Sequence, residues 1–315
     1  MNAEVNSNPV QPAETAATAP SARPPRRSVM YVPAINQRAL AKVAGLDCDA
    51  IVFDLEDAVA PAMKAEARRN LIALFAAVPT ALQERVIRVN AIDGDEFALD
   101  MAAVAACRPD AVLLPKVNAP GDFDAFAAEA GRHGLVSQVA VWAMVETPAA
   151  LLALDALVQA GLACSHRLDC LVVGTNDIAK DTGVFPGDGR SLLLPWLMNI
   201  VLVAKHRGVC VLDGVWNNFG DSAGFDAEAV QSVKMAFDGK TLIHPSQVAP
   251  ANRAFSPTEA ALTEARGIVA AFAQPEHAEA GVINLGGKMV ERLHLMQAKR
   301  LLAVQQVIDA RAAAH

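Results

Sequence analysis

Short apolar runs rich in β-branched residues recur from Ser28 onward, and each is followed by an Ala- and Leu-rich stretch with helical spacing. Such a run predicts a buried strand, and the spacing after it predicts a helix. The runs are SVMYVP, AIVFDLED, RVIRVN, AVLLPK, VAVWAMVET, LDCLVVGTND, VCVLDGVW and KTLIHP. Eight alternating strand and helix units within about 220 residues favour a closed (β/α)8 TIM barrel over an open doubly wound sheet.

The stretches between the runs predict helices at approximately 63–77, 96–106, 122–132, 148–159, 192–206 and 226–237. Two further helical stretches, at about 257–272 and 288–311, follow the eighth run and are too short for a second domain. We therefore predict a catalytic barrel domain over 28–256 and a C-terminal helical extension over 257–315. Residues 1–27 are rich in Ala, Pro, Ser, Thr and Asn and lack an apolar signal segment, which predicts a disordered tail.

Composition and charge narrow the class of protein. Hydrophobic residues make up 53% of the chain and the net charge is −7, so the chain is globular and generic binding to nucleic acid is disfavoured. The longest apolar run, near 192–204, is shorter than the ~20 residues that cross a bilayer, so no membrane span is expected. The five cysteines form no C-x-x-C pair and are typical of reduced core residues in a cytoplasmic protein.

Polar or charged residues follow nearly every predicted strand. After one strand such residues indicate only a turn or a helix cap, but the carboxyl ends of all strands of a barrel open on one face. Residues there meet in space, so a site is expected at this face. The residues at the strand ends are Tyr31 and Pro33; Asp54, Glu56 and Asp57; Arg88 and Asn90; Lys116; Glu146; Asn176 and Asp177; Asp213; and His244.

Glu146 and Asp177 end consecutive predicted strands, which lie ~4.8 Å apart in a sheet. Two carboxylates without a nearby His or Cys favour Mg²⁺, which takes one or two carboxylates and leaves its other positions to water and substrate. The alternative is that both residues only cap the helices that follow.

Three basic residues are candidates for binding an anionic ligand. Arg88, on the third strand, can hold a carboxylate or a developing enolate oxygen in bidentate fashion, or can form a structural salt bridge to Glu56 or Asp57. Arg38 and Lys42 lie four residues apart on a predicted helix, which indicates either an ordinary solvated face or a phosphate-binding patch.

The same residues lie in motifs that resemble the citrate lyase β-subunit-like family of the HpcH/HpaI aldolase superfamily. The motifs are YVPA, VFDLEDAV with Lys64, Ala67 and Arg68 downstream, IRVNA, LLPK, VET, GTNDIAKDTG, LDGV and GKTLIHPSQV, and the resemblance covers about 28–303. It implies a Mg²⁺-dependent (β/α)8 barrel that cleaves or forms a carbon–carbon bond in thioesters such as malyl-CoA or citramalyl-CoA.

The resemblance also implies roles for individual residues. Metal ligands are expected at Glu146 and Asp177, with Glu146 also near the substrate, and substrate contacts at Arg88 and Asp213. Coenzyme A contacts are expected at Tyr31, Arg38 and Lys42.

Two positions depart from the pattern of the family. Relatives carry a catalytic Asp in a C-terminal segment that usually reaches a neighbouring subunit's site, and here the matching run GGKMVERLHL offers Glu291. Asn176 stands where many relatives have an acid. Both departures leave the acyl group of the substrate open.

The sequence therefore predicts a Mg²⁺-dependent lyase that converts a 3-hydroxyacyl-CoA dicarboxylic thioester to acetyl-CoA and a 2-oxo acid, with Arg88 and Glu291 as catalytic residues. A thioesterase, a CoA-independent 2-oxo acid aldolase and a citrate lyase β-subunit that works in a complex are the alternatives. A homotrimer or hexamer is expected, with the C-terminal segment of one copy reaching a neighbouring site.

Overall fold

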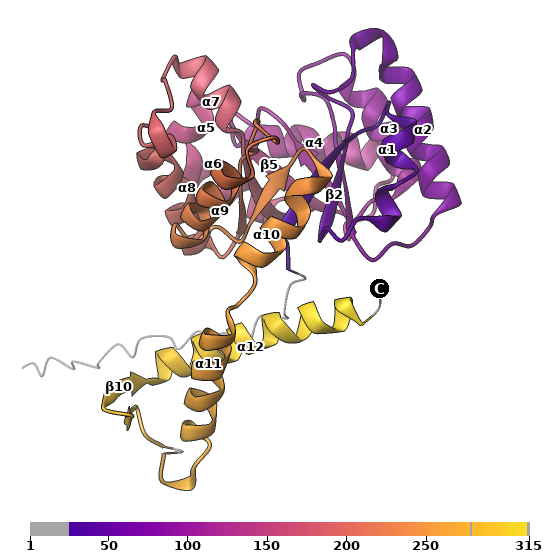
Figure 1. Ribbon diagram of the computed structural model, residues 1–315. Coiled ribbons are helices and arrows are strands. Elements are labelled where there is room, and N and C mark those ends of the chain that lie inside the picture. The colour runs from indigo at the N-terminus through magenta and orange to yellow at the C-terminus, as the bar shows by residue number, and fades with distance from the viewer. Residues whose placement is uncertain (1–24, 278, 314–315) are drawn as a thin grey trace, which may run out of the picture.

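The computed structural model describes residues 25–277 and 279–313, and its main feature is a closed barrel of parallel strands in sequence order (Figure 1). Strand β1 pairs with both β2 and β8, which closes the barrel as predicted. The strands are β1 Ser28–Pro33, β2 Ala50–Asp54, β3 Glu84–Arg88, β4 Ala111–Leu114, β5 Ala140–Val145, β6 Leu168–Val173, β7 Cys210–Asp213 and β8 Gly239–Leu242.

Helices surround the barrel. They are α1 Gln37–Leu40, α2 Lys64–Ala77, α3 Phe97–Cys107, α4 Gly121–Arg132, α5 Pro148–Leu152, α6 Leu154–Ala163, α7 Thr175–Thr182, α8 Leu194–Arg207, α9 Ser222–Lys234 and α10 Val248–Phe255. Short 3-10 helices lie at Val43–Gly45, Pro61–Met63, Asp188–Arg190, Pro245–Gln247 and Pro275–His277. The predicted helices are confirmed within a few residues, although 148–159 is split into α5 and α6. Helices α7 and α10 were not predicted.

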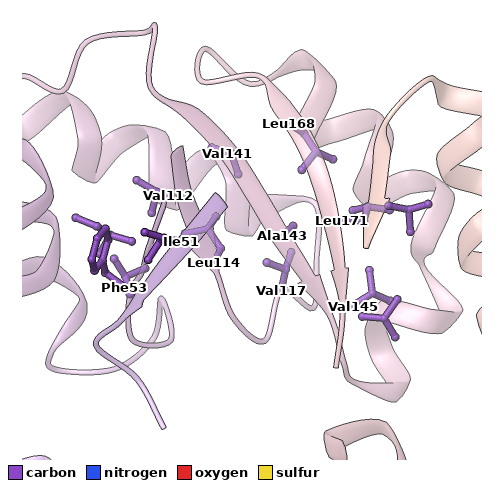
Figure 2. Packing of buried hydrophobic residues seen from close by; sticks show 14 of the residues in the cluster. Ile51, Phe53, Val112, Leu114, Val117, Val141, Ala143, Val145, Leu168 and Leu171 are labelled. Carbon is purple, nitrogen blue, oxygen red and sulfur yellow. The ribbon is translucent and has the colours of Figure 1, made fainter. Parts of the chain in front are cut away.

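Alternate residues of each strand pack on two different layers. The inner layer fills the barrel and includes Val52, Val86 and Met144. The outer layer packs under the helices, and Figure 2 shows part of it, with Ile51 and Phe53 among the labelled side chains. Because side chains alternate between the two layers along each strand, the same alternation decides which residue at a strand end faces the barrel interior.

Arginine side chains close the amino-terminal end of the barrel. Arg26 is bonded to Glu84 and also pairs with Asp169, while Arg27 makes a bidentate ion pair with Asp49. Both arginines are less than 10% exposed. The predicted disordered tail is therefore wrong for Arg26 and Arg27, because ion pairs fix both side chains. Residues 1–24 lie outside the described residues.

The C-terminal extension forms a separate layer beyond the amino-terminal end of the barrel (Figure 1). It consists of α11 Glu259–Phe272, β9 Val282–Leu285, β10 Lys288–Glu291 and α12 Arg292–Ala312. Phe272, Ile283, Val290 and Leu295 form a small core of its own. The predicted helix at 288–311 is wrong in its first four residues, which pair with β9 as a hairpin.

One ion pair holds the extension against the barrel. Near the end of α12, Arg311 donates to the carbonyl of Asp49 at 3.0 Å and lies 3.3 Å from its carboxylate, just before β2 begins. This contact keeps the extension at the end of the barrel opposite the carboxyl ends of the strands.

No helix among the described residues is both long and apolar enough to cross a membrane. All five cysteines are free thiols, and Cys48, Cys107 and Cys170 are buried, which agrees with their interpretation as core residues.

Candidate active site

A cavity of about 460 Å³ opens at the carboxyl ends of the strands. We call it the mouth cavity. Polar side chains enter it because Tyr31, Asp54 and Arg88 have the same inward parity as the inner layer of their strands. Its lining residues are Tyr31, Pro33, Asp54, Asp57, Ala58, Arg88, Met144, Val173, Gly174, Thr175, Asn176, Asp177, Val215, Asn217, Thr241 and Ile243.

Arg88 ends β3 and is held by an acid from the neighbouring strand. Its Nε and Nη2 donate to the two oxygens of Asp54 at 2.8 and 2.6 Å, and Nη1 lies 2.8 Å from Glu56. The guanidinium also lies over the Tyr31 ring, 5.0 Å from its centre. The bidentate edge of Arg88 is therefore occupied by Asp54, and the Nη1 side is the part that can meet a ligand.

Lys116 completes the charge balance around Glu56. Its ammonium contacts the Glu56 carboxylate. Despite these two cations, burial raises the pKa of Glu56 above its usual value. The backbone N–H of Lys116 donates to Glu146 at 2.8 Å, so this residue links both groups of acids.

Lys64 holds the loop that carries these acids, a role that the sequence interpretation did not assign. Its ammonium donates to the carbonyls of Leu55 and Glu56 at 2.7 and 2.6 Å and to Asn90 Oδ1 at 2.7 Å. The residue lies on the buried face of α2, three positions before Ala67. A lysine on an apolar helix face was the sequence signal, because such a residue must find buried acceptors.

Glu146 follows β5 and is 1% exposed. A Cβ atom at Gly174 would lie 2.6 Å from Glu146 Oε2, so only glycine leaves room for this carboxylate. The pKa of Glu146 is raised to about 7, mainly by burial and also by the charges of Glu56 and Asp177, although the backbone N–H of Lys116 and the charge of Arg88 lower it. The site thus gathers negative charge where water is largely excluded.

Asp177 lies in the first turn of α7 rather than at the end of β6, and its half-buried side chain lines the mouth cavity. The structure brings it close enough to Glu146 for their charges to interact. The alternative that Glu146 caps a helix does not hold, because the cap of α5 is Thr147.

These residues fit a hard divalent cation. The carboxylates of Glu146 and Asp177 are close enough for their negative charges to repel, and Glu146 occupies a space that Gly174 keeps open. Among the residues that the structure describes, no group of three or more His, Cys, Asp or Glu could hold a metal, so the donor set is not that of a structural zinc site. Two carboxylates with room for water and substrate match the preference of Mg²⁺.

Tyr31 contributes an unsatisfied polar atom to the same cavity. Its hydroxyl is buried without a hydrogen-bond partner among the described residues, and burial raises its pKa. A buried hydroxyl without a partner is costly, so a polar ligand atom is the natural partner here.

Arg38 and Lys42 are exposed and follow β1. Helix α1 ends at Leu40, so the prediction of one continuous helical face is wrong for Lys42, which precedes a 3-10 helix. Both residues remain within one short segment after β1, and their role in binding stays a prediction.

Asp213 does not face the mouth cavity, which corrects the predicted substrate contact. It is 0% exposed and points outward, because the inward position of β7 belongs to Leu212. Arg190 Nη1 donates to both its oxygens, at 2.7 and 2.9 Å, and Lys240 donates at 2.8 Å. Although burial opposes it, these cations hold the pKa of Asp213 below its usual value. Its role is structural.

Three other residues at strand ends have local partners. Asn90 is bonded to Asp100 and Lys64 below the loop. Asn176 exchanges two hydrogen bonds with Asn217 across the mouth, at 2.8 and 3.2 Å. His244 accepts from the backbone N–H of Ser246 and so holds the start of the last loop.

Glu291 lies at the end of β10, in the extension (Figure 1). Its backbone N–H donates to His294 Nδ1 at 2.9 Å. Because Arg311 holds α12 at the amino-terminal end of the barrel, Glu291 is not brought to the mouth of its own chain. Any catalytic role would have to be played at another copy.

Comparison with known proteins shows the family of the chain. The model of the family HpcH/HpaI aldolase/citrate lyase matches residues 27–245. The chain is 41% identical over 286 residues to a (3S)-malyl-CoA thioesterase of Cereibacter sphaeroides, covering 91% of this chain and 96% of the relative. It is 31% identical to the citrate lyase subunit beta of Leuconostoc mesenteroides subsp. cremoris, covering 88% and 92%.

A solved structure is similar along most of its length. The protein CitE of Mycobacterium tuberculosis, in complex with magnesium, acetoacetate and coenzyme A, is 27% identical and superposes with a TM-score of 0.71 over 90% of this chain and 98% of that chain. By the family match and this overall likeness, the chain belongs to the HpcH/HpaI aldolase/citrate lyase family.

Proposed function

We propose that the chain is a Mg²⁺-dependent lyase that splits a 3-hydroxyacyl-CoA dicarboxylic thioester, such as malyl-CoA or citramalyl-CoA, into acetyl-CoA and a 2-oxo acid. The charge interaction of Glu146 with Asp177, which lines the cavity of about 460 Å³ together with Arg88, carries this proposal. The magnesium and coenzyme A in the complex of the related CitE protein support it.

Each group has a part in the proposed reaction. Glu146 and Asp177 would hold Mg²⁺, which when bound lowers the pKa of a coordinated hydroxyl. The Nη1 side of Arg88 would face the oxygen on which negative charge develops. The buried hydroxyl of Tyr31 would donate to the bound substrate.

Product analysis tests the proposal. Purified protein with Mg²⁺ and malyl-CoA or citramalyl-CoA should release acetyl-CoA together with glyoxylate or pyruvate, and a chelator should stop the reaction. Absence of any 2-oxo acid from both substrates would refute carbon–carbon cleavage.

Hydrolysis of the same thioester is the second candidate, because the relative at 41% identity is a (3S)-malyl-CoA thioesterase. A thioesterase would release free CoA and intact malate. The two activities use the same substrate and differ only in the bond that breaks, so one experiment separates them.

Arg38 and Lys42 are proposed to bind the phosphates of coenzyme A. Arg38→Glu combined with Lys42→Glu should raise KM for the thioester about 10²-fold with kcat little changed, because hydrogen bonds to charged groups each contribute about 1.5–3 kcal/mol. Steady-state kinetics measure this effect. Cleavage of a free hydroxy-oxo acid, the reaction of a CoA-independent aldolase, should be unaffected.

A matched control separates local contact from overall charge. Arg69→Glu combined with Lys234→Glu makes the same change in net charge at two exposed positions outside the lining of the mouth cavity. If both double variants raise KM equally, the phosphate-binding role is wrong.

We further propose a homo-oligomer in which the extension of one copy covers the mouth of another. Exposed apolar side chains lie close to Glu291 along the chain in the extension, and others follow the carboxyl ends of β5, β6 and β7, at the end of α5 and in loops. The first set is Val282, Met289, Leu293 and Met296, at 50–70% exposure, and the second is Leu152, Phe185, Leu192 and Phe219, at 57–90% exposure. Burial of such surfaces between copies would stabilise the assembly.

Mixing inactive variants tests whether Glu291 acts in another copy. Glu291→Ala and Glu146→Ala should each be inactive alone. Co-expressed chains should regain about one quarter of the wild-type activity, because random assembly pairs an intact mouth with an intact extension from another copy in about one quarter of the sites. A mixture of Glu146→Ala with Glu146→Gln, which both affect the mouth, should regain none. Full activity of Glu291→Ala alone would contradict the role.

A further inference from the structure

The stretch after β2 carries three carboxylates, and the structure gives two of them fixed partners. Asp54 is 1% exposed and accepts from Arg88 through both oxygens, and also from the backbone N–H groups of Glu56 and Ala58. Glu56 is 5% exposed and lies between Arg88 and Lys116. Both acids position cations and have little freedom to react with a ligand.

Asp57 differs from both. Its side chain is 61% exposed and lines the mouth cavity. The nearest cationic atoms are Arg88 Nη1 at 4.0 Å and Lys116 Nζ at 3.9 Å, both beyond hydrogen-bond distance. Two positive charges thus keep the carboxylate at the cavity without engaging its oxygens.

The other acids that line the cavity have other work. Asp54 is bound to Arg88, and Asp177 belongs to the proposed metal site. Glu291 lies in the extension, away from the mouth of its own chain. Asp57 is therefore the carboxylate in the lining, among the residues that the structure describes, that is available for proton transfer.

We propose that Asp57 is the general base that removes the hydroxyl proton of the substrate, an inference that rests on the proposed lyase function. A general base must come within hydrogen-bond reach of the proton that it takes, and Asp57 lies on the cavity wall beside Arg88, which faces the same substrate. Rotation of an exposed, weakly paired side chain supplies that reach.

In a malyl-type thioester, Asp57 takes the hydroxyl proton, and the electron pair of the O–H bond forms the carbonyl of the 2-oxo acid. The bond between the carbinol carbon and the adjacent methylene then breaks. Its electrons enter the thioester enolate, whose carbon takes a proton from Glu291 of another copy. Asp57 returns its proton to water, and water reprotonates Glu291.

Kinetics of Asp57→Asn in the full-length protein test the assignment. The variant should lose about 10²–10⁴-fold in kcat with KM nearly unchanged. Asp57→Glu should restore part of the rate. Asp93→Asn, at an exposed position outside the cavity lining, should behave as wild type.

A second measurement separates catalysis from positioning. Calorimetric titration with Mg²⁺ alone should give the same affinity for Asp57→Asn as for wild type. An unchanged rate in Asp57→Asn, or weakened Mg²⁺ binding that accounts for the loss, would overturn the assignment while wild-type cleavage still supports the lyase. Absence of cleavage by the wild-type protein would overturn the proposed function, and the assignment with it.

Discussion

Glu146→Gln should remove turnover and at the same time make the metal-free protein more stable. The loss of turnover should be on the order of 10²–10³-fold, because a lost metal ligand removes several kcal/mol of transition-state stabilisation. The gain in stability follows from burial: Glu146 is 1% exposed and lies near Glu56 and Asp177, so its ionised form is disfavoured in the folded protein. Glutamine has nearly the same shape without the charge.

The pH dependence has a definite sign. The pKa of Glu146 is about 7 in the folded protein against 4.5 for an ordinary glutamate. Between these values the folded state binds the proton more tightly than the unfolded state, so wild-type stability decreases as the pH rises from 4.5 to 7. At pH values above 7 the ionised Glu146 lowers the free energy of unfolding by up to about 3 kcal/mol, since each unit of pKa corresponds to about 1.4 kcal/mol. Glu146→Gln should therefore exceed wild type at pH 8 and equal it below pH 4.5.

Urea unfolding at pH 5 and pH 8, with a chelator and with Mg²⁺, measures both effects. Mg²⁺ should stabilise the wild type more at pH 8 than at pH 5, because the ion competes with a proton for the same carboxylate. Asp177→Asn is the matched control: it should also abolish the stabilisation by Mg²⁺, but without a comparable gain, because Asp177 is only half-buried. A Glu146→Gln protein that is less stable than wild type at pH 8 would contradict the account.

The barrel itself was predictable because its signal repeats. All eight apolar runs became strands of one closed sheet, since a run flanked by helical spacing leaves few other ways to bury its residues. Helix α7 was missed because its eight residues, TNDIAKDT, are mostly polar and carry little apolar periodicity. The hairpin of β9 and β10 was missed because its strands have only four residues each and are partly exposed.

The site was only partly predictable, and the errors have one physical origin. Asp54, Arg88 and Glu146 point inward since they share the inward parity of their strands, whereas Asp213 is one position out of phase and points at Lys240. Asp213 has the same parity as Val211, which packs outward, but the sequence alone does not show which side of the strand Val211 faces. The position of Glu291 could not be derived in this way, because a salt bridge from Arg311 to Asp49 sets it.

Replacement of Arg88 should have the second large effect, because this residue serves both the fold and the proposed chemistry. Arg88→Gln leaves Asp54 buried without its cation and Glu56 with Lys116 alone, which should lower the free energy of unfolding by about 3–5 kcal/mol. It should also lower turnover on the order of 10²–10³-fold through loss of a charged donor at the developing oxyanion. Urea unfolding and steady-state kinetics measure the two losses separately.

The double variant Arg88→Gln with Asp54→Asn separates the two roles. Two neutral amides can exchange hydrogen bonds where the bidentate ion pair was, so much of the lost stability should return. Turnover should stay low, since no cation then faces the substrate on this side of the cavity, and Lys116 remains engaged with Glu56. If the double variant regains both stability and wild-type turnover, Arg88 acts only as a support for Asp54, and the developing charge must be stabilised by Tyr31 and the metal site instead.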